Sequence, residues 1–405
     1  MMGKIIVLCR HAVETLTYFS KQLAEAFTAW GYEIFWMDFE KTGLSAWKLR
    51  QIVPQKEAVL LTFNFIGLSG EEELWEFSDE GEPVRSLWEK LDMPCLNIMV
   101  DHPVYYAQAL QYPAGDLRTF CIDRDHVAFM KRFYPHIFCE FLPLAGNCLI
   151  KDSSFVPETD EMMYEQWMRR PDTLAFTANY VPVSEIERQF AAMEPEYREF
   201  YYGMIESLIQ EPDQNLLSCM ETHLRREIPD LSDADLCKAM SAMPAVDLWI
   251  RTYFREKTVR ILVDGGIRVH VSGKDWEKIS CDHPENLICT GRMVNSADCV
   301  RAMAQAKLAL NTMPWFKDGA HDRIFTAMLQ GTAALTDGSA YLREQFWHMD
   351  TLVYYDLHHL DELPEQVREL LAHPRRLFDM ACRGQAAARQ AHMWKHRAQQ
   401  LKNYM

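Results

Sequence analysis

Short apolar runs alternate with helical patterns through the first 145 residues. Apolar positions recur at helical spacing over Thr15–Trp30, and Gly31 stands where a helix C-cap is expected. A second helical pattern covers Pro83–Leu91. Buried strands alternating with helices predict a parallel sheet with helices on both faces. The expected strands are Lys4–Cys9, Glu33–Met37, Ala58–Asn64, Cys95–Asp101, Arg118–Ile122 and Ile137–Leu142.

The pattern then changes to helix from about Lys151 to Arg260. One possible strand, Thr173–Thr177, interrupts this segment, and Ser184 and Ser232 carry helix-start signals. Alternation resumes after Gly266 and ends in helix from about 363 to 404, broken near Pro374. The later strands are expected at Ile267–Ser272, Asn286–Thr290, Lys307–Asn311, Thr332–Thr336 and Leu352–Tyr355, with a crossover helix at Ser296–Ala306.

This order predicts an α/β protein with two doubly wound Rossmann-like domains facing a cleft and a helical insert. The expected segments are 1–150, 151–260 for the insert, 261–362, and 363–405 for the C-terminal helices. Ligands of such sheets bind beyond the carboxyl ends of the strands, so the cleft is the expected site.

Composition narrows the function classes. The net charge of −16 argues against binding to nucleic acid or to an anionic membrane surface. No apolar run reaches the ~20 residues of a transmembrane helix, so no integral membrane segment is expected. The eleven cysteines are scattered without a C-x-x-C pair, which is typical of a reducing compartment and predicts a cytoplasmic protein.

The most unusual feature is a cation at a predicted helix start. Between the strands Lys307–Asn311 and Thr332–Thr336, a helix is expected from His321 to Gln330, which puts Arg323 in its first turn. The helix dipole makes a cation unfavourable there, whereas the free N–H groups of the same end bind anions. A phosphate in front of the helix would explain Arg323. The alternative is a turn of its side chain towards Asp322 or another carboxylate.

The run G-A-H-D-R-I-F-T-A-M-L-Q-G-T-A-A-L-T-D, residues 319–337, resembles the CgeB-type, spore-maturation-protein-like glycosyltransferases of the GT-B superfamily. The strand pattern Ile267–Trp276 and the Gly291-Arg292 junction are similar to the same family. The resemblance extends over about Arg260–Tyr355, while the N-terminal half is similar only in general architecture.

The resemblance implies a nucleotide-sugar donor on the C-terminal domain, an acceptor on the N-terminal domain, and neither an obligatory metal nor a cofactor. Arg323 would face the donor phosphates, with N–H groups at His321 and Asp322. Gly273 and Lys274 follow a strand where backbone approaches a phosphate, and Arg292 is a second possible clamp; each also has the plain alternative of a turn or a surface cation.

The chain departs from the family pattern at Thr326, where the family has a glutamate. In related enzymes that carboxylate commonly holds the ribose hydroxyls of the donor. A threonine cannot grip a diol in the same bidentate way, which puts donor identity and activity in question.

Two residues of the N-terminal half compete as general base. His11 follows the first strand, and Asp101 follows a later buried strand. A histidine titrates near neutral pH and suits proton transfer. Neither base is required if transfer retains the anomeric configuration. Asp123-Arg-Asp125 imitates a metal-binding D-x-D, but Asp123 is expected to cap the next helix, and no metal site is predicted.

The expected activity is transfer of a sugar from a nucleoside diphosphate to an acceptor hydroxyl or a protein side chain, the acceptor being a protein, a glycan or a small molecule. The alternative is a catalytically silent scaffold that binds a nucleotide sugar or a partner protein, for which Thr326 is the best support. A sugar-nucleotide epimerase of the same architecture is a third possibility, although no carboxylate cluster for hydrolysis is evident.

Overall fold

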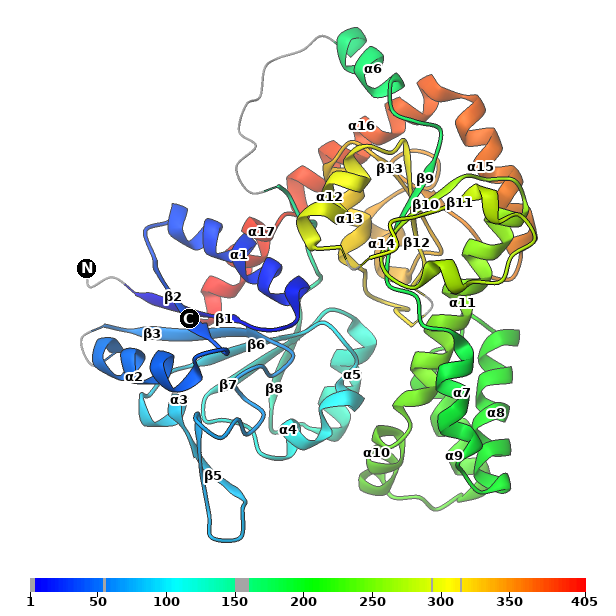
Figure 1. The fold of residues 1–405 in the computed structure, drawn as a ribbon. Helices are drawn as coiled ribbons and strands as arrows, with labels where there is room; N and C mark the ends of the chain where they lie inside the picture. Colours follow the sequence, from blue (N-terminus) through cyan, green and yellow to red (C-terminus); the bar gives the residue numbers. More distant parts are fainter. Residues whose placement is uncertain (1–3, 54–55, 150–159, 293, 314) are drawn as a thin grey trace. The chain divides into compact units, whose positions relative to one another are not determined.

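The computed structural model describes residues 4–53, 56–149, 160–292, 294–313 and 315–405 (Figure 1). The chain divides into two compact units. The first consists of residues 1–145 together with 393–405, and the second of residues 146–392. The end of the chain, grouped with the preceding helices in the sequence analysis, thus returns to the first unit.

The first unit is built on a six-stranded sheet in the order β2-β1-β3-β6-β7-β8, with every neighbouring pair parallel. The strand order reverses direction between β1 and β3, which is the switch point where sheets of this kind bind ligands. The strands are β1 (Ile5–Arg10), β2 (Glu33–Asp38), β3 (Ala58–Phe63), β6 (Cys95–Met99), β7 (Leu117–Cys121) and β8 (Phe138–Phe141).

Helices accompany this sheet as the alternating pattern predicts. Gly31 has a positive φ of 82° after the first of them, as expected for a helix end. The helix predicted at 83–91 is partly wrong, because residues 83–86 pair with β4 as a hairpin strand before a short helix begins. The elements are α1 (Glu14–Ala29), α2 (Thr42–Ile52), β4 (Trp75–Phe77), β5 (Pro83–Ser86), α3 (Leu87–Lys90), α4 (Ala107–Gln111), α5 (Arg124–Phe133) and α17 (Trp394–Leu401).

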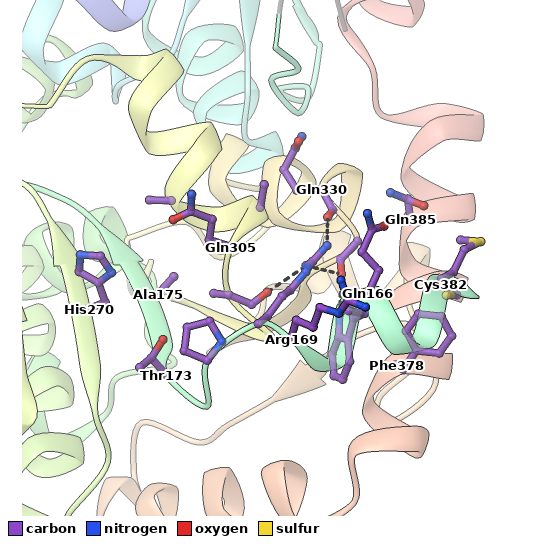
Figure 2. A pocket seen from close by; sticks show the side chains of 18 residues that line it. Gln166, Arg169, Thr173, Ala175, His270, Gln305, Gln330, Phe378, Cys382 and Gln385 are labelled. Atoms are coloured by element: carbon purple, nitrogen blue, oxygen red, sulfur yellow. Dashed lines mark hydrogen bonds between the residues drawn. The ribbon is translucent and has the colours of Figure 1, made fainter. Parts of the chain in front are cut away.

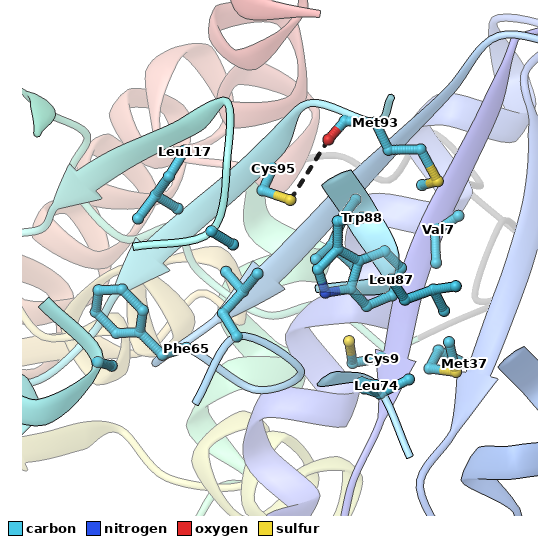
Figure 3. Packing of buried hydrophobic residues seen from close by; sticks show 14 of the residues in the cluster. Val7, Cys9, Met37, Phe65, Leu74, Leu87, Trp88, Met93, Cys95 and Leu117 are labelled. Atoms are coloured by element: carbon cyan, nitrogen blue, oxygen red, sulfur yellow. Dashed lines mark hydrogen bonds between the residues drawn. The ribbon is translucent and has the colours of Figure 1, made fainter. Parts of the chain in front are cut away.

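The core of the first unit lies on both faces of the sheet. Every residue of β3 is buried, as expected for a central parallel strand. Figure 3 shows Val7, Trp88 and Phe65 packed together on one face. The last helix contributes Trp394, whose ring lies 4.9 Å from that of Phe19, so residues from the two ends of the chain complete one core.

The second unit contains another six-stranded parallel sheet, in the order β11-β10-β9-β12-β13-β14. Numbered within the unit, this is the order 3-2-1-4-5-6, with its switch point between β9 and β12. The strand predicted at Thr173–Thr177, within the helical segment, is therefore the first strand of this sheet and lies at its switch point. The strands are β9 (Leu174–Thr177), β10 (Val269–Ser272), β11 (Leu287–Cys289), β12 (Leu308–Asn311), β13 (Ala333–Thr336) and β14 (Val353–Tyr354).

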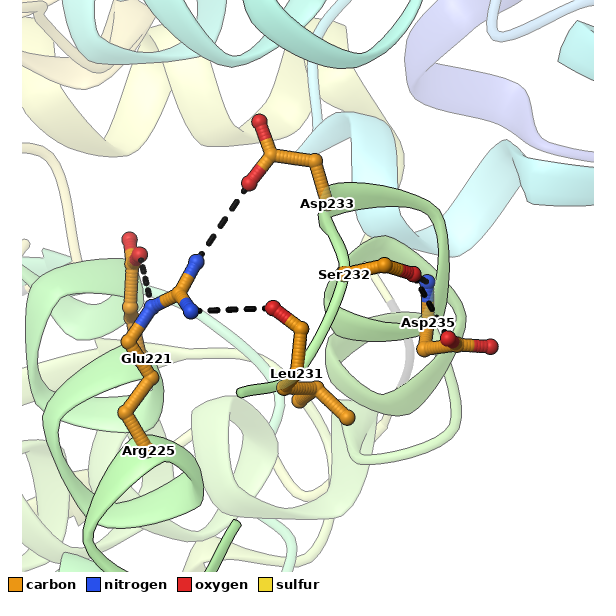
Figure 4. Close-up of polar contacts among 6 residues, drawn as sticks. All are labelled: Glu221, Arg225, Leu231, Ser232, Asp233 and Asp235. Carbon is orange, nitrogen blue, oxygen red and sulfur yellow. Dashed lines mark hydrogen bonds and ion pairs between the residues drawn. The ribbon is translucent and has the colours of Figure 1, made fainter. Parts of the chain in front are cut away.

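Five helices lie between β9 and β10 and form the helical insert. Ser232 caps α10 through a hydrogen bond from the Asp235 N–H, as the sequence predicts. Arg225 joins α9 to the start of α10 by donating to the Leu231 carbonyl and pairing with Asp233 (Figure 4). The capping box expected at Ser184 is wrong, since the helix begins at Val183 and its cap position, Pro182, makes no side-chain hydrogen bond. The helices are α7 (Val183–Ala191), α8 (Pro195–Gln210), α9 (Leu216–Glu227), α10 (Asp233–Ser241) and α11 (Pro244–Asp264).

The remaining helices of the second unit cover its sheet. The predicted break near Pro374 is present between α15 and α16. Within the described residues, no helix combines the length and the apolar character needed to cross a membrane. These helices are α6 (Asp160–Met168), α12 (Ser296–Ala304), α13 (Asp322–Leu329), α14 (Ala340–Gln345), α15 (Leu363–Ala372) and α16 (Pro374–Ala391).

Candidate functional site

The start of α13 lies beside the switch point of the second sheet. The preceding strand β12 ends at Asn311, next to β9, and a loop leads to His321, the N-cap of α13. Because both strands are parallel, their carboxyl ends and the N-terminus of α13 meet at one edge of the sheet. This is where a doubly wound sheet presents free N–H groups to a ligand.

Arg323 is buried at this edge, with 8% of its surface exposed. Its guanidinium donates to Oδ1 of Asn311 at 2.9 Å and contacts Nε2 of His321 at 3.1 Å. No carboxylate of the described chain forms an ion pair with it, so the predicted alternative of a turn towards Asp322 is not what the structure shows. A buried cation whose direct partners are neutral leaves room for an anion.

The contacts of His321 define its protonation. Since an arginine only donates, Nε2 of His321 must accept, and its proton resides on Nδ1. Nδ1 lies 2.7 Å from Oδ1 of Asp322 and 3.3 Å from the Arg323 backbone nitrogen; the shorter contact makes it a donor to the carboxylate, so it does not accept the Arg323 N–H. Burial, together with the charge of Arg323, lowers the pKa of His321 to about 4. The imidazole is therefore neutral at pH 7 and adds no positive charge of its own.

Asp322 and Thr326 are held by a segment that the sequence did not single out. Nδ2 of Asn147 donates to Oδ2 of Asp322 at 2.9 Å, and the Asn147 N–H donates to Oγ1 of Thr326 at 3.0 Å. A Cβ at Gly146 would lie 2.7 Å from the Phe325 carbonyl oxygen, so only glycine allows this approach to α13. The hydroxyl of Thr326 thus accepts a hydrogen bond from the backbone of the segment that packs on α13.

The other predicted donor residues follow β10 and β11 at the same edge. A Cβ on Gly273 would lie 1.8 Å from the carbonyl oxygen of Ala178, so strand packing alone demands glycine there. The side chain of Lys274 is 47% exposed, with Nζ 4.0 Å from Asp275. Arg292 is exposed after the edge strand β11, three strand spacings or about 14 Å from β12. Arg292 is therefore remote from Arg323 along the sheet.

Helix α11 of the insert adds two arginines that the sequence analysis missed. The guanidinium carbons of Arg251 and Arg255 lie 4.7 and 4.9 Å from the ring centre of Trp315, in the loop that leads to α13. The charge of Arg255 also contributes to the lowered pKa of His321. The spacing of four residues indicates that both arginines lie on one face of a helix. It does not indicate that this face meets Trp315, which lies more than fifty residues later.

A partly buried carboxyl completes this edge. Both oxygens of Asp337, just after β13, lie 3.0 Å from the Met313 nitrogen. Burial raises the pKa of Asp337 to about 6. Its charge is therefore sensitive to pH in the mildly acidic range.

In the first unit, His11 follows β1 at the corresponding edge. Its Nδ1 accepts the Val13 N–H at 3.2 Å, and its ring meets that of Phe39 edge-on. Burial lowers the pKa of His11 below its ordinary value. In the neutral form the proton then resides on Nε2, which makes that nitrogen a donor.

Asp101 lies after β6 and is bound to the end of β3. Its Oδ2 accepts from Nδ2 of Asn64 at 3.0 Å and from the Tyr106 hydroxyl at 3.4 Å. Asn64 and Phe65 both have positive φ, 50° and 58°, a conformation that costs non-glycine residues about 1–2 kcal/mol each. Strained backbone persists where surrounding contacts fix it and is frequent at functional sites. Sequence patterns gave no sign of Asn64.

Asp123 caps α5 by accepting the Asp125 N–H, as predicted. Among the described residues, no three His, Cys, Asp or Glu side chains gather in a way that would hold a metal ion. The D-x-D run is therefore explained by helix capping.

Comparison with known proteins places this geometry in context. The chain is similar to a sucrose-phosphate synthase from Thermosynechococcus elongatus, with 10% identity, coverage of 99% of this chain and 98% of the other, and a TM-score of 0.50. It is likewise similar to Anabaena HepE in complex with UDP-glucose, with 10% identity, coverage of 100% and 99%, and a TM-score of 0.51. A comparison with curated proteins finds no match. The structural likenesses confirm the predicted fold class, and residues 251–403 match the model of a family described as glycosyl transferase-like.

Proposed function

We propose that this protein transfers a sugar from a nucleoside-diphosphate donor to an acceptor hydroxyl or protein side chain. One observation carries the proposal: Arg323 is a buried cation at the N-terminus of α13, bonded directly to neutral groups at the switch point of its sheet. When the glycosyl bond breaks, negative charge develops on the leaving diphosphate. A guanidinium and free N–H groups fixed beside it stabilise that charge.

The glycosyl transferase-like match supports this proposal, because residues 251–403 include Arg251, Arg255 and Arg323. Arg255 of α11 would give the diphosphate further positive charge, whereas the charge of Arg251 is balanced by Asp247 at 2.6 Å. The UDP-glucose bound by HepE makes uridine diphosphate sugars the first donors to test. Within the wider superfamily, we propose membership of the CgeB-type branch and transfer without a metal ion.

For the acceptor, we propose Asp101 as the base if the transfer inverts configuration. A carboxylate oxygen can take the proton of an attacking hydroxyl, and Asn64 and Tyr106 hold the group in place. The geometry supports His11 less well, since its Nδ1 is committed to the Val13 N–H.

The test is thermal stability against a panel of nucleotides and nucleotide sugars, followed by mass spectrometry for nucleoside-diphosphate release. A ligand of the native state raises the midpoint by linkage. We expect a shift with one nucleoside diphosphate and a larger shift, with slow diphosphate release, for its sugar. If no member of the panel shifts the midpoint, the transferase proposal fails.

The second candidate is a silent scaffold, favoured by Thr326. Its hydroxyl accepts the Asn147 N–H, and the residue is only 2% exposed, so the hydroxyl is not accessible to a ribose. This candidate predicts a midpoint shift without diphosphate release, under any acceptor supplied. Turnover with any donor excludes it.

A further inference from the structure

A pocket of about 770 Å³ lies at the opposite edge of the second sheet (Figure 2). Its residues precede the strands: Thr173 comes before β9, Ala306 before β12 and Gly331 before β13. The Arg323 site follows β12, so the two features occupy opposite ends of the same strands. The volume is in the range of pockets for small organic ligands.

Small residues create the hollow. Ala175 on β9, together with Ala302, Ala304 and Ala306 at the end of α12, contributes only methyl groups to the lining. Helix α16 and α6 form the far wall with Phe378, and Figure 2 shows His270 on the side opposite Phe378 and Cys382. The result is a lining of apolar patches between polar groups.

Four glutamines supply most of the hydrogen-bonding groups. Gln166 and Gln305 make no side-chain hydrogen bond within the described chain, so both ends of each carboxamide are available. Gln330 and Gln385 use Nε2 to donate to the carbonyls of Asn147 and Leu329, which leaves each Oε1 as an acceptor. The four glutamines therefore offer both hydrogen-bond donors and acceptors and carry no charge.

The positive charge around the pocket is partly compensated. Arg170 is committed to carbonyls at the ends of α12 and α13, which carry the negative ends of both helix dipoles. Only Arg169 adds a mobile positive charge, and no acidic side chain belongs to the described lining. The four glutamines therefore match a ligand that is dense in groups that both donate and accept, which describes sugar hydroxyls. The alanine methyls suit the C–H faces of sugar rings.

We propose that this pocket is a second saccharide-binding site, which takes a neutral oligosaccharide independently of the donor site. In a glycosyltransferase such a site would retain a glycan chain between transfers. The binding itself does not depend on that activity, because every contact named here lies away from Arg323.

Cys382 gives a direct readout because it lines the pocket and is partly exposed. The full chain would be alkylated with iodoacetamide in the presence of maltotetraose, cellotetraose or chitotetraose, with peptide mass spectrometry for each cysteine. We expect one tetrasaccharide to slow labelling of Cys382 at least threefold. Cys281 is also partly exposed but lies outside the pocket, and its labelling should not change.

Variants separate this site from the donor site. The double variant Gln166→Leu/Gln305→Leu should lose the protection of Cys382, whereas Gln189→Leu on the exposed face of α7 should keep it. Arg323→Met should also keep it while losing nucleotide binding, so the two proposals can fail separately. Protection by none of the tetrasaccharides, equal protection by trialanine, or protection that survives the double variant would overturn the inference.

Discussion

Helix α13 has an arginine at each end, and the surroundings of the two arginines differ. Arg170 meets its C-terminus and donates to the carbonyls of Gln330 and Gly331, to that of Ala306, and to Oγ1 of Thr332, at 2.9–3.2 Å. Arg323 is in the first turn, where its direct partners are the neutral side chains of Asn311 and His321.

The helix dipole explains the difference. Arg170 faces partial negative charge and fills orphan carbonyls of two helix ends, so its position is stabilising. Arg323 faces partial positive charge and gains nothing from the dipole. Burial lowers the pKa of Arg170 to about 10 and also lowers that of Arg323, yet both remain charged at pH 7. Arg170 is therefore stabilised by its position, whereas Arg323 is not, which is the difference that the proposed phosphate role of Arg323 would explain.

The largest effect is expected at Arg170. Arg170→Met removes four hydrogen bonds of a charged donor and leaves the Gln330 carbonyl without its side-chain donor, so the free energy of unfolding should fall by about 3–5 kcal/mol. Denaturant unfolding measures it. The matched control is the exposed neighbour Arg169→Met, which should change stability by less than about 0.5 kcal/mol. Equal losses at both positions would remove the structural role assigned to Arg170.

The second prediction concerns the pH dependence of stability that Asp337 contributes at the N-terminal end of α13. Its folded pKa of about 6 lies above the unfolded value near 3.8, so the folded state holds a proton that the unfolded state releases. Stability from this group is complete below pH 4 and is lost as pH rises to 6, by about 3 kcal/mol. In Asp337→Asn that loss should vanish when unfolding is measured between pH 4 and 6. An unchanged pH slope contradicts the assignment.

Arg323→Met should act on binding more than on stability. We expect affinity for the preferred nucleoside diphosphate to weaken by about 1.5–3 kcal/mol, the range for a hydrogen bond to a charged group. Calorimetric titration measures it, and Arg292→Met on the edge strand is the control with little expected effect. Unchanged affinity in the folded Arg323 variant would falsify the phosphate role and make the two arginines equivalent.

His321 should show the opposite pH dependence from Asp337. Its folded pKa of about 4 lies below the unfolded value of 6.5. Stability from the neutral imidazole is complete above pH 6.5 and is lost as pH falls towards 4, by about 2 kcal/mol because the ring is partly exposed. Replacing it by Gln should remove that loss. A His321→Gln profile that runs parallel to the parent would mean that the histidine is charged beside Arg323.

Thr326 should give the smallest effect. Thr326→Val removes the acceptor of the buried Asn147 N–H and should cost about 1–2 kcal/mol of unfolding free energy. Thr326→Ser keeps the acceptor and should recover most of this loss. Denaturant unfolding of the two variants measures this difference. Equal midpoints for Thr326→Val and the parent would show that stability does not require the hydroxyl.

Local patterns predicted most elements of both sheets. Lys307–Asn311 and Thr332–Thr336 are strands within one residue of their expected bounds, and the helix between them begins with His321 as its cap. These features depend on neighbours a few residues apart. The pattern also found the strand at Thr173–Thr177 but not its central place, because its partners in the sheet come after the insert.

The candidate site was predictable where its residues are consecutive. Arg323, His321 and Asp322 form one turn, and a cation in a first turn contradicts a known electrostatic rule. Asn147 and Arg255 reach α13 from distant segments, and no periodicity marks them. Asn64 was missed because the partners of its side chain, Val100 and Asp101, lie 36 and 37 residues later in the chain.

The return of α17 to the first unit has a consequence for synthesis of the chain on the ribosome. Trp394 packs against Phe19 and Phe63, whose strand and helix emerge almost at the beginning of translation (Figure 1). The whole second unit is made in between. At 5–20 residues per second this interval lasts roughly 10–50 s.

During that interval the aromatic surface of Phe19 and Phe63 has no native cover. The packing of the first unit can therefore be completed only after the second unit has been synthesised. The first unit, although it is synthesised first, thus depends on an eight-residue helix that is synthesised last.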